Sequence, residues 1–252
     1  MTDYLLVHGL GQGAWCWGAV WGYLTAPEEH PPTLHKRRRA NRVHPLDLPG
    51  HGADADGDTG AVRLEECVQA INKAVEREQL KDLVLVGHGI SGSLVVQAAK
   101  EMAVPPKRVV LVAGIVPAPQ RPLLSAIPSR TRAAFNLFAI LSSLSGQELK
   151  LPRPAINGLL CNGMDPMDVV QLVGFLSPLP TKVLKSRLSI EDTTMPCPVT
   201  YIVLTDDKLI PPDAQLRIAE RFESVETVEI ESCHQVMAQR PKELAEVLLR
   251  YA

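Results

Sequence analysis

Short runs of consecutive apolar residues alternate along the chain with stretches in which apolar residues recur every three or four positions. Runs that are apolar at successive positions are typical of strands buried on both faces of a parallel sheet. They cover residues 4–7, 83–86, 109–113 and, apart from one threonine, 199–204. Two further strands are predicted at 43–48 and 225–230, where polar residues interrupt the apolar ones. The stretches with helical spacing cover residues 15–24, 64–80, 93–102, 214–222 and 242–251. This alternation predicts an α/β fold with helices on both faces of the sheet.

Residues 118–190 interrupt the alternation. They contain helical stretches at 131–144 and 165–175 and many prolines, but no convincing strand. Crossover connections in parallel sheets are normally much shorter. We therefore interpret 118–190 as a helical cap, inserted into a single domain of residues 1–252, that walls a pocket over the carboxyl ends of the strands.

Composition and charge narrow the range of partners. Hydrophobic residues make up 46% of the 252 residues, and 26 basic side chains nearly balance 28 acidic ones, giving a net charge of −2. These values exclude a disordered chain and a strongly basic nucleic-acid binder. The basic run at 36–39 is typical of a solvated loop. We expect a small-molecule ligand and no nucleic-acid partner.

The cysteines and the N-terminal residues bear on the cellular compartment. The cysteines are odd in number and widely spaced, without metal-ligand spacing, and we interpret them as reduced thiols: Cys16, Cys67, Cys161, Cys197 and Cys233. The first residues lack the basic start and apolar stretch of a secretion signal. Apolar runs are far shorter than the roughly 20 residues that cross a bilayer. We expect a cytoplasmic protein that does not contact the membrane.

Residues 83–102 combine a strand, a glycine turn and a helix, which is the geometry of a nucleophile elbow with the motif G-x-S-x-G. Here the motif reads Gly87-His88-Gly89-Ile90-Ser91, with Gly89 in the place of the nucleophile. Farther along, Asp207 follows one strand and His234 follows the last. The order of elbow, acid and histidine matches the catalytic order of that fold.

These motifs resemble the α/β-hydrolase superfamily, in the branch of plant methyl esterases, hydroxynitrile lyases and small bacterial esterase-like relatives. The resemblance spans nearly the whole chain and implies a mostly parallel central sheet flanked by helices, with a helical cap. Its matching stretches are Val7-His8-Gly9, Trp15-Cys16-Trp17, Asp47-Leu48-Pro49-Gly50-His51-Gly52, Val84-Leu85-Val86-Gly87-His88, Asp207-Lys208-Leu209-Ile210-Pro211-Pro212, and His234 with Arg240-Pro241. Many relatives are dimers, so the resemblance allows a homodimer. The sequence does not decide the oligomeric state.

Each position of the site can be given a physical role. Glycine tolerates the strained backbone of an elbow, so Gly89 keeps the turn and removes the nucleophile. The backbone N–H groups of Leu10 and Ile90 are expected to converge as an oxyanion hole, which needs no side chain. Asp207 is expected to orient His234, whose second ring nitrogen then faces the space over Gly89.

Several neighbouring residues offer alternatives to these roles. Ser91 lies about 200° around the helix from Gly89, so we interpret it as a packing residue. Asp206 competes with Asp207, but the Asp-x-x-Ile-Pro spacing favours Asp207. Cys233 adjoins His234 without a basic partner that would lower its pKa. We interpret His88 and His51 as structural.

Bulky apolar residues near these motifs are candidates for the substrate-binding wall, although each also suits the core. They are Trp17, Phe135, Phe138 and Met237. The substrate is expected to be small and largely apolar, with a carbonyl or other oxygen for the oxyanion hole. We expect no cofactor and no metal.

Loss of the serine disfavours acyl-enzyme chemistry, because deleting a triad serine costs on the order of a millionfold in turnover. Three hypotheses remain. In the first, a His–Asp general base acts without a covalent step, in water addition, proton abstraction, carbon–carbon cleavage or cofactor-free oxygen chemistry. In the second, the chain only binds a ligand. In the third, it is a serine esterase whose serine is replaced by glycine. Retention of both Asp207 and His234 favours the first.

Overall fold

The computed structural model describes residues 2–9, 11–25, 41–55, 58–145, 148–190 and 192–252. Their strands pair in the order β2-β1-β3-β4-β5-β6, and every pair is parallel. The strands are β1 (Asp3–Val7), β2 (Arg42–Leu46), β3 (Leu83–His88), β4 (Arg108–Val112), β5 (Val199–Leu204) and β6 (Glu226–Ile230). The predicted α/β class with a parallel sheet is confirmed.

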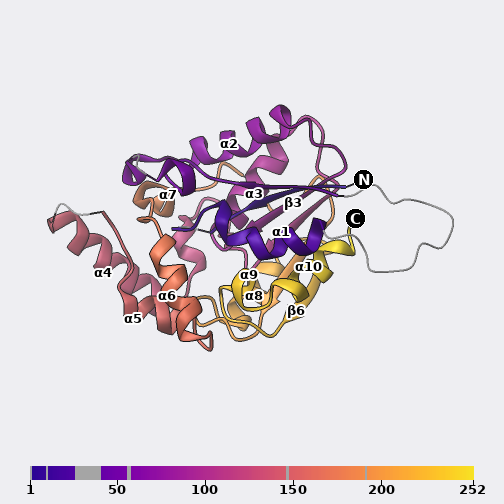
Figure 1. The fold of residues 1–252 in the computed structure, drawn as a ribbon. Coiled ribbons are helices and arrows are strands. Elements are labelled where there is room, and N and C mark those ends of the chain that lie inside the picture. Colours follow the sequence, from indigo (N-terminus) through magenta and orange to yellow (C-terminus); the bar gives the residue numbers. More distant parts are fainter. Residues whose placement is uncertain (1, 10, 26–40, 56–57, 146–147, 191) are drawn as a thin grey trace.

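Helices cover both faces of this sheet (Figure 1). Leu5 and Val7 of β1 join the core beneath α2 (Leu64–Arg77) and α3 (Ser91–Glu101). Tyr4 and Leu6, the alternate residues, join the core formed with α1 (Gly18–Thr25) and α10 (Pro241–Leu249). Successive side chains of a strand point to opposite faces, so a run that is apolar throughout supplies both cores.

Between β4 and β5, most of the regular structure in the described residues is helical. Its elements are η4 (Leu123–Ala126), α4 (Ser129–Ser145), α5 (Arg153–Ala155), η5 (Ile156–Leu160), α6 (Pro166–Phe175) and α7 (Thr181–Lys185). A single antiparallel bridge between Pro122 and Arg187 brings the two ends of this segment together. Apolar residues of the segment, among them Phe135 and Leu172, pack in the same core as one face of the sheet. We call residues 118–190 the cap.

The remaining helices begin close to their predicted positions, with one difference. The helix predicted at 15–24 is divided into the 3-10 helix η1 (Ala14–Trp17) and α1. Near the C-terminus, α8 (Pro212–Ala219) follows β5 and α9 (Val236–Gln239) follows β6. The basic run at 36–39 lies outside the described residues. Among the described helices, none is long and apolar enough to span a bilayer.

Candidate active site

Gly89 occupies the sharp turn between β3 and α3, with a φ of +55°. This is the left-handed region, which costs a residue with a Cβ roughly 1–2 kcal/mol. Backbone hydrogen bonds fix the turn: Gly89 N–H donates to the Val112 carbonyl at 3.0 Å, and the Gly89 carbonyl accepts from Ile115 N–H at 2.7 Å. The strained elbow predicted from the sequence is therefore present.

Asp207 and His234 lie together beside this turn. His234 Nδ1 is 2.7 Å from Asp207 Oδ2, as the order of the motifs predicts. Asp207 Oδ1 accepts hydrogen bonds from the backbone N–H groups of Leu209 and Ile210, at 2.8 and 2.9 Å. A carboxylate held by two backbone donors and a histidine is fixed in orientation, and it fixes the plane of the imidazole ring in turn.

The other ring nitrogen, His234 Nε2, faces Gly89. A Cβ built on Gly89 would lie 3.2 Å from Nε2. Both residues line the same pocket, and Nε2 has no hydrogen-bond partner among the described residues. With Nδ1 donating its proton to Asp207, Nε2 carries the lone pair. Nε2 is thus aimed at the position where a side chain of residue 89 would begin.

Only one of the two predicted oxyanion-hole donors can be placed. Ile90 lies directly before α3 and lines the pocket, and its N–H donates to no described residue. An N–H at the start of a helix also lies at the positive end of the helix dipole, which favours an anionic oxygen. Leu10, the second predicted donor, lies outside the described residues.

The structure removes the alternatives to this pair. Ser91 Oγ is fully buried and donates to the His8 carbonyl, so it does not reach the pocket. Asp206 is exposed, whereas Asp207 is buried. Burial raises the pKa of Cys233 to about 11, which keeps its sulfur protonated and unreactive at neutral pH.

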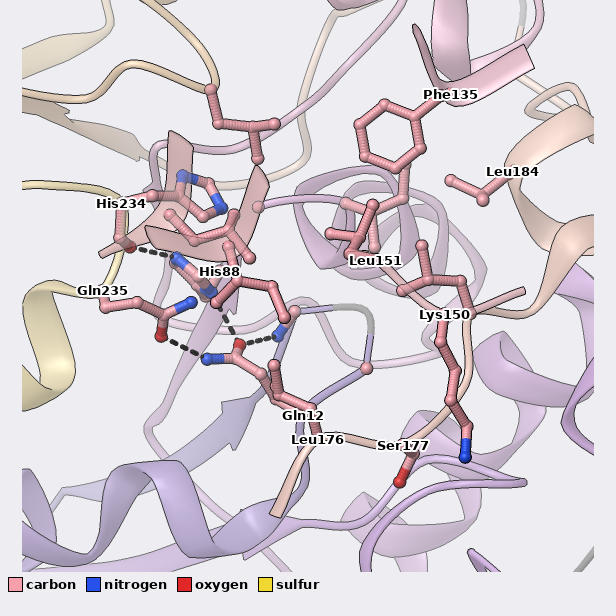
Figure 2. A pocket seen from close by; sticks show the side chains of 18 of the residues that line it. Gln12, His88, Phe135, Lys150, Leu151, Leu176, Ser177, Leu184, His234 and Gln235 are labelled. Atoms are coloured by element: carbon pink, nitrogen blue, oxygen red, sulfur yellow. Dashed lines mark hydrogen bonds between the residues drawn. The ribbon is translucent and has the colours of Figure 1, made fainter. Parts of the chain in front are cut away.

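A buried hydrogen-bond chain runs beside the His234 ring (Figure 2). Gln12 Nε2 donates to Gln235 Oε1 at 2.6 Å, and Gln12 Oε1 accepts from Gly9 N–H at 3.0 Å. His88 lies between Gln12 and His234. Its Nε2 is 2.9 Å from the His234 carbonyl, and its Nδ1 is 3.1 Å from Gln12 Oε1. Burial, and then the neighbouring His234, lowers the pKa of His88 well below its usual value. The neutral ring has one N–H proton, which it can donate to only one of these two oxygens. Its contact with the His234 carbonyl helps to position the loop that carries His234.

Gln12 and Gln235 were not identified from the sequence. Both are almost fully buried and both line the pocket. Only the position of Gln235 next to His234, and of Gln12 in the glycine loop after β1, could have pointed to them.

The pocket lies between the strand ends and the cap, with a cavity volume of about 170 Å³. A cavity of about 150 Å³ lined by aliphatic and aromatic side chains accepts benzene, so this pocket suits a ligand with an apolar body of similar size. Phe135 lines it, as predicted, together with cap residues such as Leu151 and Leu184 (Figure 2). Lys150 and Ser177 also line the pocket.

Three predicted wall residues are corrected by the structure. Trp17 and Met237 are buried in the core on the other face of the sheet, with α1 and α10. Phe138 packs against the cap core, and none of the three lines the pocket. Apolar character alone does not tell which face of the sheet a side chain meets, or whether a cap side chain points into the pocket, and this is why the pattern misplaced them.

Comparison with known proteins supports what the fold and the site suggest. The model of the alpha/beta hydrolase family matches residues 4–247, and the chain belongs to this family. Methylesterase 9 from Arabidopsis thaliana is 26% identical over 266 residues, covering 100% of this chain and 98% of that protein. A carbendazim hydrolyzing esterase from Nocardioides sp. (strain SG-4G) is 27% identical over 128 residues, which is 51% of this chain and 48% of that esterase.

Among solved structures, an extracellular alpha/beta-hydrolase from a Paenibacillus species shares the fold. Its TM-score is 0.80 at 20% identity, with 100% of this chain and 99% of that chain covered. The family and the esterase relatives together support an enzyme with the α/β-hydrolase fold.

Proposed function

We propose that this chain hydrolyses small, largely apolar esters by direct general-base activation of water, with His234 and Asp207 as the base and without an acyl-enzyme. The observation that carries the proposal is the His234 ring, held at Nδ1 by Asp207 and aimed through Nε2 at the open position over Gly89. Esterase relatives favour an ester as the substrate.

The space over Gly89 suits a water molecule. Replacing the hydroxymethyl group of serine by hydrogen frees a volume close to that of water, at the place where His234 Nε2 accepts a proton. The left-handed turn at Gly89 is retained without a nucleophile. A water there occupies the position from which a serine oxygen would attack.

The reaction follows from this placement. His234 Nε2 takes a proton from water as the water oxygen bonds to the carbonyl carbon, and the electron pair of the C=O bond moves to its oxygen. Ile90 N–H stabilises the resulting oxyanion, and Asp207 stabilises the imidazolium. Collapse of the tetrahedral intermediate re-forms the carbonyl and expels the alkoxide, which takes the proton back from Nε2. The products are a carboxylic acid and an alcohol.

The test is hydrolysis of short-chain aryl esters such as phenyl acetate by the wild-type protein, His234→Ala and Gly89→Ser. We expect wild-type turnover with no initial burst of phenol and no acylated protein in the mass spectrum. His234→Ala should lower the rate by about 10²- to 10⁴-fold, the usual contribution of a general base. Gly89→Ser should introduce a burst, because the serine Cβ needs His234 to move by only a few tenths of an ångström.

Three outcomes contradict the proposal, and the first two identify its alternatives. Turnover that appears only in Gly89→Ser would show a serine hydrolase that lacks its nucleophile. Binding of phenyl acetate analogues without turnover in either protein would show a ligand-binding member of the family. Wild-type turnover that persists unchanged in His234→Ala would remove the base from the mechanism.

A further inference from the structure

The orientations of the two buried carboxamides can be derived from a single backbone donor. Gly9 N–H can only donate, so the Gln12 atom 3.0 Å away is the oxygen Oε1. Gln12 therefore presents its Nε2 to Gln235, 2.6 Å away, and that contact requires the oxygen of Gln235. It follows that the NH₂ group of Gln235 is the end that is left over.

This NH₂ group is a donor without an acceptor in the part of the chain that the structure describes. Neither hydrogen on Gln235 Nε2 has an acceptor among the described residues, yet the side chain lines the pocket beside His234 and only 2% of the residue is exposed. Nε2 itself is not fully enclosed by protein atoms of the described residues, and it therefore reaches the pocket surface. Much of the remaining pocket wall is aliphatic, from residues such as Ile115 and Leu209.

We infer that Gln235 donates a hydrogen bond to an oxygen of the substrate other than the carbonyl oxygen at Ile90, and so selects esters with a second oxygen close to the reacting carbonyl, such as 2-hydroxy esters. The inference rests on the proposed function, because it takes this pocket as the substrate site. Gln235 is a specificity-determining residue in this assignment, and Gln12 positions it.

The physical reason is the cost of covering a polar group with an apolar one. A ligand that has only carbon opposite Gln235 Nε2 strips that amide of water and gives nothing back. A ligand with an oxygen there restores the bond. One neutral hydrogen bond of this kind is worth about tenfold in affinity.

The experiment compares two ligand pairs that differ by one hydroxyl group. Titration calorimetry measures the Kd of mandelamide, each enantiomer separately, against that of phenylacetamide. Hydrolysis gives kcat/KM for methyl mandelate against methyl phenylacetate. We expect the wild-type protein to prefer one enantiomer of the hydroxylated member about tenfold in both measurements.

Two variants of Gln235 remove the donor in different ways. Gln235→Glu keeps an oxygen for Gln12 Nε2 but offers no N–H, and Gln235→Met removes both groups without adding charge. Each should abolish the tenfold preference for the hydroxylated member, in both the Kd and the kcat/KM comparison. Gln239→Met is the matched control. It loosens the same loop through Cys233 N–H and the Gly163 carbonyl without touching the pocket, and it should keep the preference.

The outcomes separate this inference from the proposed function. A preference that is absent in the wild type, or that survives in both Gln235 variants, overturns the inference. Ester turnover without any preference overturns the inference and leaves the proposed function standing. A binding preference that is lost in the Gln235 variants, with no ester turnover by the wild type, supports the inference and overturns the proposed function.

Discussion

Residue 89 has the backbone geometry of a nucleophile elbow, but it is a glycine and has no nucleophilic side chain. The φ of +55° is required by the turn itself, since the Gly89 N–H and carbonyl are both committed to hydrogen bonds with the chain around β4. Glycine meets this requirement at the lowest cost. The Asp207–His234 pair is kept beside it because the two residues are positioned by other loops, each with its own contacts.

The importance of the Asp207 charge can be tested with an isosteric change. In Asp207→Asn, Oδ1 can still accept from Leu209 N–H, but the amide NH₂ then faces His234 Nδ1 and forces its proton onto Nε2. A protonated Nε2 cannot accept a proton from water, so kcat for ester hydrolysis should fall by about 10²- to 10⁴-fold. Asp206→Asn, an exposed neighbour with the same change of charge, should stay within about twofold.

The same residues show how far the sequence predicts a site. Asp207 and His234 could be found because each follows a strand in a fixed order along the chain. Gln12 and Gln235 could not, because their function depends on a contact between residues 223 positions apart. Their places in the glycine loop and next to His234 are the only local signals, and only the fold shows that both are buried beside the His234 ring.

The strain at the elbow, between β3 and α3, can be measured against a glycine in a regular helix. Gly89→Ala places a Cβ in the left-handed region and 3.2 Å from His234 Nε2, so it should lower the free energy of unfolding by about 1–2 kcal/mol. Gly22→Ala lies on the exposed side of α1, with no atom within 4 Å of the new Cβ, and should raise it by about 0.5–1 kcal/mol. Urea denaturation measures both. Equal effects of the two substitutions would contradict a strained elbow.

Among the elements, strands could be predicted more closely than helix boundaries. The run at 199–204 matches β5 because a strand covered on both faces is apolar at nearly every position, with Thr200 as the exception here. The helix predicted at 15–24 splits because Ala14–Trp17 adopts a tighter turn, and its apolar spacing does not distinguish 3-10 from α geometry. α8 begins at Pro212, two residues before its predicted start, since proline at the first turn requires no N–H partner.

For the whole molecule, the sheet divides the apolar interior into two cores, and the site lies where the strand ends meet the cap. Polar residues at and just after these strand ends are buried, and they include histidines that have little contact with solvent. His8, His51 and His88 are each at most 1% exposed. Local spacing does not predict this burial, because it arises from contacts between segments far apart in the sequence, such as His8 with Leu48 N–H and His88 with the His234 carbonyl.

Burial of these histidines links folding to pH. Burial lowers the pKa of His8 to about 3, and it lowers the pKa values of His51 and His88 below their usual value. In the unfolded chain each histidine titrates near 6.5. Above that pH both states are neutral and folding takes up or releases no proton at these sites. Below it the unfolded state binds protons that the folded state does not, so stability must fall as the pH falls.

We therefore expect the free energy of unfolding to be nearly constant from pH 8 to 7 and to decrease from pH 6.5 to 5, by up to about 1.4 kcal/mol per pH unit for each such histidine. Urea denaturation at half-unit pH intervals measures the slope. His51→Asn keeps a donor for the Pro49 carbonyl, which His51 Nδ1 contacts at 2.9 Å, but cannot titrate, so it should reduce the slope in this range. Because His51 Nε2 is enclosed without a hydrogen-bond partner among the described residues, its loss removes no other contact of this kind. A stability that is flat from pH 7 to 5, or a slope that His51→Asn leaves unchanged, would show that these side chains are protonated as readily in the folded chain as in the unfolded one.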